Sequence, residues 1–449
     1  MKTATFPVQR EYSCDVLVVG GGVTGFSAAV AAARCGADVM LCENGGALGG
    51  IATKGLVGPF MTCYDKKGEN QIIRGFFSEF VQRMVAEGGA ISHTECKGND
   101  SFSGYRPYGH FGVTPFDPEC FKRVAETICV ESGVKLMYHA QLIGAEAEND
   151  TIKSAYFSTV AGVEMVHAKV FIDTTGNSSL AAHAGAETFY GDEDGMVQTC
   201  STFFQISGVD KEALDKHMAE NTEMRARYFM DVLEEGRNSG EYPCGCQKLR
   251  IFEGLNGMWF VNMSQEDQQV CDLDVTQVTN AEVSQRTMIP KIVAFLKKNI
   301  YPLRNIQLVH TASDIGIRES RRIVGKTLLT GEDISRSRYY DERIAVCANS
   351  IDIHQKDKVA YTEYTNDKNY YIPLSCLISK NITNLMAAGK CMSADKYAFA
   401  AVRVIPPCFA MGEAAGITAA YALKEGNVPA NVDVKTVQAK ILENGGYLE

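Results

Sequence analysis

The chain has 449 residues, of which 45% are hydrophobic and 22% are charged, and its mean hydropathy is -0.11. This is enough apolar material for two or three domains of about 150 residues each, and it excludes an intrinsically disordered protein. The net charge of -10 and the pI near 5.5 argue against a broadly cationic surface that would bind nucleic acids or lipids.

The 15 cysteines are odd in number and lie in apolar segments, which is typical of reduced cysteines packed as small hydrophobic residues. Cys244 and Cys246 are separated by one residue and have no second pair to complete a zinc site. No run of about 18 apolar residues predicts a membrane span, and residues 1–15 lack a signal-peptide pattern. We therefore expect a cytoplasmic protein with no membrane span, no nucleic-acid partner and no metal centre.

The first predicted elements form a dinucleotide-binding unit. Residues 15–20 (DVLVVG) predict a buried parallel strand, 26–35 an alanine-rich helix, and 37–42 (ADVMLC) a second strand. Glu43 follows that strand, where a carboxylate can accept hydrogen bonds from the ribose hydroxyls of an adenosine. The strand, turn, helix, strand and acid occur in the order that such a unit requires.

Three glycines in the first turn each have a mechanical reason. Gly20 permits the tight turn, Gly22 lets the backbone approach a pyrophosphate, and Gly25 allows close contact between helix and strand. The phosphates would lie at the helix N-terminus, where unpaired N–H groups and the positive end of the helix dipole favour anions. The turn therefore predicts a bound dinucleotide.

A second glycine-rich loop, residues 44–53 (NGGALGGIAT), follows the acid, and an NAD-binding unit has no need of it. Residues 168–176 predict a strand that ends in Asp-Thr-Thr-Gly, and residues 382–389 predict a strand that ends in Ala-Gly. A Gly-x-Ala-Ala-Gly helix segment follows at residues 412–416. With these motifs the chain resembles the glutathione-reductase-like class of FAD-dependent oxidoreductases.

Within that class, the chain is most similar to a subfamily of bacterial FAD-dependent oxidoreductases distantly related to the fumarate reductase flavoprotein. The subfamily hallmark resembles residues 316–325 (GIRESRRIVG). Arg318 and Glu319 in this run become possible site residues through the resemblance, while most of its charges fit a solvated face or internal salt bridges. Where the subfamily carries an arginine and then histidines, this chain has Lys390, Lys396 and Phe399.

The resemblance implies FAD as cofactor and an α/β fold: a Rossmann-like FAD-binding domain of the glutathione reductase type with an inserted α+β substrate or cap domain. We expect a discontinuous FAD-binding domain at 1–75, 105–190 and 375–430, a cap at 190–375, and a helical tail at 431–449. The residues expected to bind FAD are Gly20, Gly22, Val23, Thr24, Gly25, Glu43, Asn44, Gly49, Gly50, Ile51, Thr53, Thr175, Gly176, Gly389, Gly412, Ala415 and Gly416.

Four residues are candidates for the chemistry. Arg403 lies in an apolar segment just before the helix that faces the flavin in the family, where it could bind a carboxylate or a polarised oxygen, or be structural. Lys396 and Tyr397 occupy the stretch where the subfamily has histidines, and either could donate a proton. His110 lies between aromatic residues and glycines in a loop that could reach a pocket.

Asp352 and His354 share one face of a predicted strand, which indicates a packing or supporting pair. Our leading hypothesis is hydride transfer between flavin N5 and a small polar substrate: a hydroxy or unsaturated carboxylate, or a sugar-like polyol. The alternative is a flavoprotein without net redox turnover, such as an isomerase, a lyase or a protein with structural FAD. No second GxGxxG motif follows a strand, so the electron donor or acceptor is unknown. A homo-oligomer is possible.

Overall fold

The computed structural model describes residues 5–61, 63–106, 109–265, 269–354, 359–362 and 368–449. At its centre is a five-stranded parallel sheet with the order β19-β8-β2-β3-β4. Its strands are β2 (Val16–Val19), β3 (Val39–Cys42), β4 (Lys135–Met137), β8 (Val170–Asp173) and β19 (Leu385–Ala387). Strands β2, β3 and β8 are buried along their whole length, because both faces of the sheet are covered.

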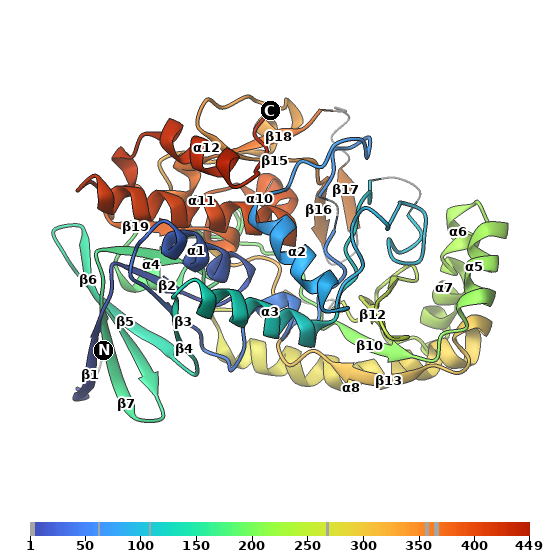
Figure 1. The fold of residues 1–449 in the computed structure, drawn as a ribbon. Coiled ribbons are helices and arrows are strands. Elements are labelled where there is room, and N and C mark those ends of the chain that lie inside the picture. The colour runs from blue at the N-terminus through green and yellow to red at the C-terminus, as the bar shows by residue number, and fades with distance from the viewer. Residues whose placement is uncertain (1–4, 62, 107–108, 266–268, 355–358, 363–367) are drawn as a thin grey trace.

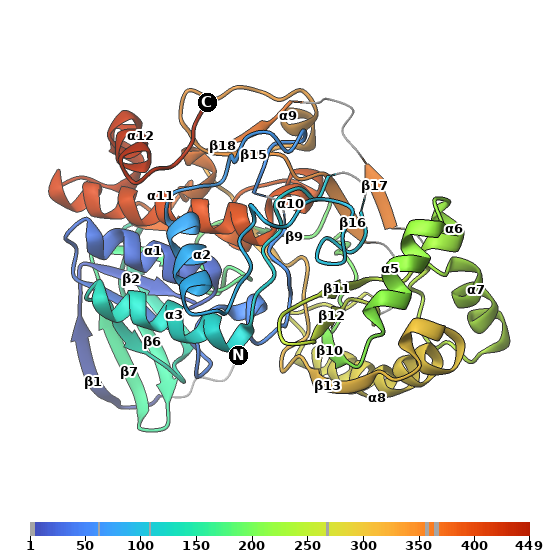
Figure 2. The same cartoon turned by 45° about the vertical axis from the view of Figure 1, so that its right-hand side comes forward.

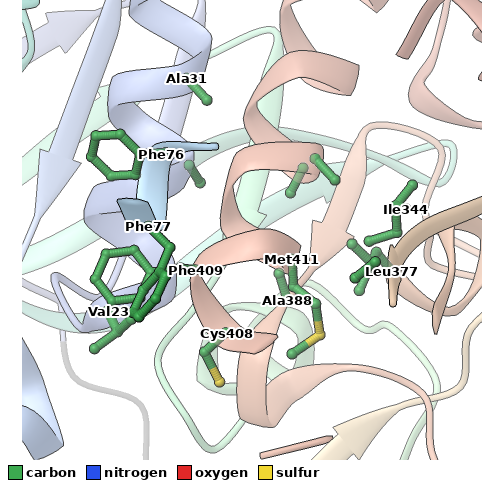
Figure 3. Packing of buried hydrophobic residues seen from close by; sticks show 14 of the residues in the cluster. Val23, Ala31, Phe76, Phe77, Ile344, Leu377, Ala388, Cys408, Phe409 and Met411 are labelled. Atoms are coloured by element: carbon green, nitrogen blue, oxygen red, sulfur yellow. The ribbon is translucent and has the colours of Figure 1, made fainter. Parts of the chain in front are cut away.

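Helices cover one face of this sheet (Figure 1). They are α1 (Val23–Arg34), α2 (Phe76–Ala86), α3 (Pro118–Glu131) and α11 (Ile405–Lys424). Aromatic rings fill the space between them: the ring of Phe26 lies 5.2–5.7 Å from those of Phe76, Phe80, Phe121 and Phe409. Figure 3 shows Phe76, Phe77 and Phe409 where α2 meets α11. Helix α3 has an N-cap, because the Asp117 carboxylate accepts a hydrogen bond of 2.9 Å from the Glu119 N–H.

A second, four-stranded sheet covers the opposite face. It has the order β1-β7-β6-β5, from β1 (Val8–Ser13), β5 (Gln141–Glu148), β6 (Thr151–Thr159) and β7 (Gly162–His167). Leu17 and Val19 point toward it, while Val16 and Val18 point toward the helices, as the two-residue period of a strand requires. Strands β5, β6 and β7 form a three-stranded antiparallel meander within this sheet. Strand β1 was not predicted, because its residues are mostly exposed and polar.

A separate hydrophobic core lies on the other side of the molecule (Figure 2). Its sheet has the order β11-β12-β10-β13, from β10 (Phe204–Ser207), β11 (Ile251–Glu253), β12 (Trp259–Val261) and β13 (Gln307–Thr311). The helices are α5 (Lys211–Glu220), α6 (Met224–Arg227), α7 (Met230–Ser239) and the long α8 (Val275–Asn299). We propose that this α+β unit, near residues 200–311, is the cap.

The proposed cap is smaller than the expected 190–375, because described residues within 344–353 and 370–378 pack in the same core as α1 and α11. This part contains β15 (Arg343–Cys347), β18 (Tyr370–Pro373) and η3 (Leu374–Leu377), and Ile344 and Leu377 lie beside α11 in Figure 3. We therefore propose that this segment belongs with the dinucleotide-binding unit. The tail contains η5 (Pro429–Asn431) and α12 (Val434–Glu443), which packs on α11 and β15.

Shorter elements connect the units. They are η1 (Gly50–Ala52), α4 (Ser179–His183), β9 (Thr188–Tyr190), η2 (Tyr301–Leu303), β14 (Arg321–Ile323), α9 (Gly331–Ser335), β16 (Ile351–His354), β17 (Val359–Thr362), η4 (Gly389–Cys391) and α10 (Lys396–Val402). Among the described residues no single helix is long and apolar enough to cross a membrane, and the bent pair α10 and α11 meets that test only when its two arms are combined.

Candidate active site

The carboxyl ends of four neighbouring strands meet in one cleft. Gly20 follows β2, Glu43 follows β3, Thr174 follows β8 and Ala388 follows β19, and all four residues line the cleft. The chain runs from β2 to β3 on one side of the sheet and later returns to β8 on the other, so the strand order reverses between β2 and β8. Open α/β sheets bind ligands at this kind of reversal.

The first glycine turn has the geometry that a dinucleotide needs. Gly20 has a φ of +102°, and a Cβ on Gly25 would lie 1.8 Å from the carbonyl oxygen of Gly20, so the turn and the close helix–strand contact both require glycine. A Cβ on Gly22, in contrast, would have no protein atom within 4 Å. The backbone at Gly22 is therefore open to the cleft, and a pyrophosphate can approach it at the start of α1.

Helices α1 and α11 lie side by side and run in the same direction. A Cβ on Gly412 would lie 2.3 Å from the carbonyl oxygen of Thr24, and one on Gly416 would lie 2.1 Å from that of Ala28. Both helices therefore begin at the cleft, which Thr24 and Ile405 line. Two positive helix ends point at one place, which suits an anionic ligand. We call residues 20–24, 174–176 and 388–390 the cofactor floor.

An ion-pair group lies at the β3 end of the cleft. The carboxylate of Glu43 accepts hydrogen bonds from the N–H groups of Gly21 (2.7 Å) and Gly45 (2.8 Å). Lys54 Nζ lies 3.0 Å from Glu43 and 3.2 Å from Asp314. Burial alone would lower the pKa of Lys54, but the two carboxylates outweigh it and raise that pKa. The carboxylate of Glu43 is thus fixed by these contacts where a ribose would be bound.

At the other end, Arg403 lies between α10 and α11 and lines the cleft together with Lys390, Ile317 and Cys408. Its guanidinium group donates hydrogen bonds to the side-chain oxygen of Gln198 (3.3 Å) and to the carbonyl oxygen of Asp352 (3.1 Å). Gln198 Oε1 also accepts a hydrogen bond of 3.2 Å from the N–H of His354. One network thus joins Arg403 to strand β16.

Asp352 and His354 form the titratable pair of this network. His354 Nε2 lies 3.0 Å from Asp352 Oδ2, and the side chains are 4% and 33% exposed, respectively. Burial and the charge of Arg318 lower the pKa of His354 to about 3. Burial would raise the pKa of Asp352, but His354, Arg403 and Arg250 outweigh it and hold that pKa below its ordinary value. At neutral pH a neutral imidazole therefore donates to an ionised carboxylate.

Arg318 is buried behind the pair and donates to the Thr199 carbonyl (2.6 Å) and the Ser201 hydroxyl (2.7 Å). Burial and the nearby Arg403 lower the pKa of Arg318 to about 10. We call Gln198, Arg318, Asp352, His354 and Arg403 the charged wall. Asp352 is the acid of this wall, so the wall carries more positive than negative charge.

The remaining charges of the hallmark run are structural. Arg322 lies 3.0 Å from Glu319 with both side chains fully buried, and its guanidinium group lies between the rings of Phe189 (4.7 Å) and Phe399 (4.9 Å). Glu319 also accepts a hydrogen bond of 3.2 Å from the N–H of Gln198. The run therefore forms internal salt bridges, as one of its two sequence interpretations held, and it supports the charged wall.

The cleft brings together most of the residues expected to bind FAD: Gly20, Gly22, Val23, Thr24, Glu43, Asn44, Gly50, Ile51, Thr175 and Gly176. The others, Gly25, Gly49, Thr53, Gly389, Gly412, Ala415 and Gly416, lie outside its lining. Several of these are packing positions, such as the helix contacts at Gly412 and Gly416. Thr53 lines a neighbouring cavity of 670 Å³ between α3 and the cap sheet.

The four predicted catalytic residues divide. Arg403 lines the cleft. His110 Nδ1 donates a hydrogen bond of 3.1 Å to the carbonyl oxygen of Ser103, and burial lowers the pKa of His110 to about 3, with the charge of Arg106 adding to the shift. Lys396 forms an ion pair of 2.6 Å with Asp192, and Tyr397 is 53% exposed. Neither of these last two lines the cleft, and their catalytic role stays a prediction.

Sequence reasoning missed several lining residues: Lys54, Gly55, Thr174, Asp314, Ile315, Ile317, Ala388, Lys390, Ile405 and Cys408. Thr174 and Ala388 stand inside recognised motifs and could have been included. Lys390 departs from the subfamily pattern, and this departure could have marked it as a candidate lining residue. Asp314 and Ile315 come from the segment before the hallmark run and have no such signal.

Solved structures with similar folds include a geranylgeranyl bacteriochlorophyll reductase-like protein from Thermoplasma acidophilum, at 12% identity and a TM-score of 0.47, covering 96% of this chain and 84% of that one. The p-nitrophenol 4-monooxygenase PnpA from Pseudomonas putida DLL-E4 has 11% identity and a TM-score of 0.47, with 96% and 85% covered. L-proline dehydrogenase from P. horikoshii has 13% identity and a TM-score of 0.44, with 98% and 100% covered.

No curated protein matches the sequence. The family model described as FAD dependent oxidoreductase matches residues 15–441, nearly the whole chain. The glycine turn that is open at Gly22, the fixed carboxylate of Glu43 and the two helix N-termini all fit the anionic, ribose-containing cofactor of that family. The chain therefore belongs to the family of FAD-dependent oxidoreductases, its cofactor is FAD, and the fold and cofactor that the sequence resemblance implied are confirmed.

Proposed function

We propose that this enzyme oxidises or reduces a small organic acid, which the guanidinium group of Arg403 binds by its carboxylate. The observation that carries the proposal is the position of Arg403, which lines the cleft and is also joined to the Asp352–His354 pair. A guanidinium group offers a planar set of donors that matches a carboxylate. This favours the hydroxy or unsaturated carboxylates among the candidate substrates over the polyols.

The net charge of the surroundings supports an anionic substrate. Arg250, Arg318 and Arg403 all act electrostatically on the Asp352–His354 pair, and that pair contributes one negative charge. An additional carboxylate in this place would relieve the repulsion between the arginines. A neutral polyol would leave it unchanged.

The proton of the reaction is assigned to the Asp352–His354 pair. Asp352 is ionised and its Oδ1 has no hydrogen-bond partner among the described residues, so this oxygen can accept a hydrogen bond from a substrate hydroxyl, while His354 holds Oδ2. FAD supplies the acceptor or donor of the hydride. In the oxidation of a 2-hydroxy acid, the C2–H bond gives up a hydride and the O–H bond gives a proton to the pair. Because the pKa of His354 is about 3 and that of Asp352 lies below its ordinary value, the pair passes this proton on to water at neutral pH. Reduction of a 2-keto acid reverses both movements, whereas reduction of an unsaturated acid places the hydride on one alkene carbon and the proton on the other.

The test is anaerobic mixing of the holoenzyme with 2-hydroxy acids and with polyols, and of the photoreduced holoenzyme with unsaturated and keto acids. We expect at least one acid to bleach or restore the flavin absorption. Arg403→Met should keep FAD bound. It should lower the second-order rate constant for the reaction of the flavin with the acid about 100-fold or more, because one side of a buried charged contact is lost. Arg336→Met, at an exposed ion pair with Glu332, is the matched control and should change nothing.

Bleaching by polyols alone would overturn the acid assignment. A flavin that no compound bleaches, together with conversion of a substrate without net redox change, would support the alternative of an isomerase or lyase. If Arg403→Met and the wild type reacted with the acid at equal rates, Arg403 would not be a substrate-binding residue.

A further inference from the structure

Lys390 places a cation on the cofactor floor beside the start of α1. Gly389 has a φ of +65°, and a Cβ there would lie 2.4 Å from Thr24 Oγ1, so the backbone after β19 passes directly against the first turn of α1. Lys390 is the next residue, and it lines the cleft. Its Nζ lies 3.9 Å from the position that a Cβ on Gly176 would occupy. The backbone next to Lys390 therefore lies against the first turn of α1, and the ammonium group itself lies beside Gly176, just after β8.

The surroundings of this ammonium group are short of negative charge. Nζ donates a hydrogen bond of 2.5 Å to the carbonyl oxygen of Ile317, which uses one of its three donors. The acids that line the cleft are Glu43 and Asp314, and both pair with Lys54 at the other end. Among the described residues Lys390 forms no ion pair. Two helix N-termini and Arg403 add further positive potential to the same place.

The protonation of Lys390 reflects this environment. Burial lowers the pKa of Lys390, the charge of Arg403 lowers it further, and Asp272, Cys391 and Cys408 act in the opposite direction. A half-buried cation that faces two helix N-termini is stabilised by an anion more than by any neutral group. The anion that the cofactor of this family brings to the start of the first helix is its diphosphate.

We propose that Lys390 binds the diphosphate of FAD by a charge-assisted hydrogen bond, in addition to the N–H groups of the glycine turn. This assigns a specific ligand to the position at which the chain departs from its subfamily. It concerns the bound cofactor and is independent of which substrate reacts.

The first experiment compares Lys390→Gln with the wild type in FAD affinity, measured from the fluorescence of FAD released on dilution of the holoenzyme. Loss of a hydrogen bond to a charged group should raise the dissociation constant about 10- to 100-fold. Lys390→Arg, which keeps the charge, should restore most of the affinity. Lys380→Gln removes the same charge from an exposed ion pair with Glu187, and this control should bind FAD as the wild type does.

The second experiment locates the contact on the cofactor. After removal of FAD, the wild-type protein is titrated with ADP and with adenosine, which differ by the diphosphate. Lys390→Gln should reduce the preference for ADP by about the same factor as it reduces FAD affinity, with adenosine binding unchanged. If Gln does not pack, Lys390→Met, which keeps the aliphatic stem, replaces it. Unchanged FAD affinity, or weaker FAD binding with an unchanged preference for ADP, would overturn the assignment.

Discussion

The cofactor floor and the charged wall differ in how their parts are distributed along the chain. Each segment of the floor carries its own glycine pattern next to a strand, and residues 20–24 act within a single turn. The wall is assembled from Gln198, Arg318, Asp352 and Arg403, and the bond from Arg403 to Gln198 spans 205 positions. Backbone geometry thus leaves a local signature in the sequence, whereas a cluster of charged side chains leaves none.

The largest expected effect tests whether the wall depends on the buried pair behind it. Arg322→Met leaves the carboxylate of Glu319 buried without its cation, and we expect a loss of about 3–5 kcal/mol in the free energy of unfolding. Denaturant unfolding of the apoprotein measures it. The double variant Glu319→Gln with Arg322→Met should recover part of the loss, whereas Arg336→Met at its exposed pair should change stability by less than about 0.5 kcal/mol. If Arg322→Met and Arg336→Met lost similar free energies of unfolding, the buried pair would not be a structural support of the wall.

A smaller effect tests the floor at two glycines in the same turn. Gly25→Ala puts a Cβ 1.8 Å from the Gly20 carbonyl oxygen, so we expect a loss of up to about 3 kcal/mol from overpacking, although alanine is the better helix former. Gly22→Ala has open space and should unfold as the wild type does, but it should bind FAD more weakly, because the methyl group enters the space of the diphosphate. Thermal melting of the apoprotein measures the loss of stability, and FAD titration measures the loss of cofactor affinity. A Gly25→Ala variant as stable as the wild type would show that the contact between α1 and the Gly20 carbonyl oxygen can shift to accommodate a methyl group.

The smallest effect tests the electrostatics of the wall through pH. The pKa of His354 is about 3 in the folded protein and about 6.5 in an unfolded chain. Because the unfolded state binds the extra proton in that window, stability decreases as the pH falls from 6.5 toward 3, by up to about 1.4 kcal/mol per pH unit. The lowered pKa of Asp352 acts in the same direction at lower pH.

We expect His354→Gln to lose about 1 kcal/mol less stability than the wild type between pH 6 and pH 5. Urea unfolding at the two pH values measures this difference, and His217→Gln, at a partly buried histidine on α5 that stacks on Phe229, is the control. Parallel stability curves for wild type and His354→Gln would mean that His354 is protonated in the folded state.

Particular residues show why the floor could be predicted as a unit, whereas the wall could be predicted only in some of its members and not in their assembly. Gly20, Gly22 and Glu43 are recognisable because their roles depend on neighbours within a few tens of positions. Asp352 and His354 share a strand face, so their pairing was predicted, but the arginines that set their charge come from distant segments. Lys396 was assigned to catalysis by its place in the subfamily pattern, yet it pairs with Asp192, which lies 204 positions away. No local pattern indicates such a partner.

The order of segments in the central sheet also determines when the protein can fold during synthesis. Strand β19 completes the edge next to β8, and α11 packs on α1, although β19 and α11 follow their partners by more than two hundred positions. Until residues 385–424 have left the ribosome, the edge of β8 and the apolar face of α1 are uncovered, and contacts this distant in sequence form slowly. We therefore expect the central sheet to stay incomplete until residues 385–424 are synthesised, and FAD to be held tightly only after they have packed.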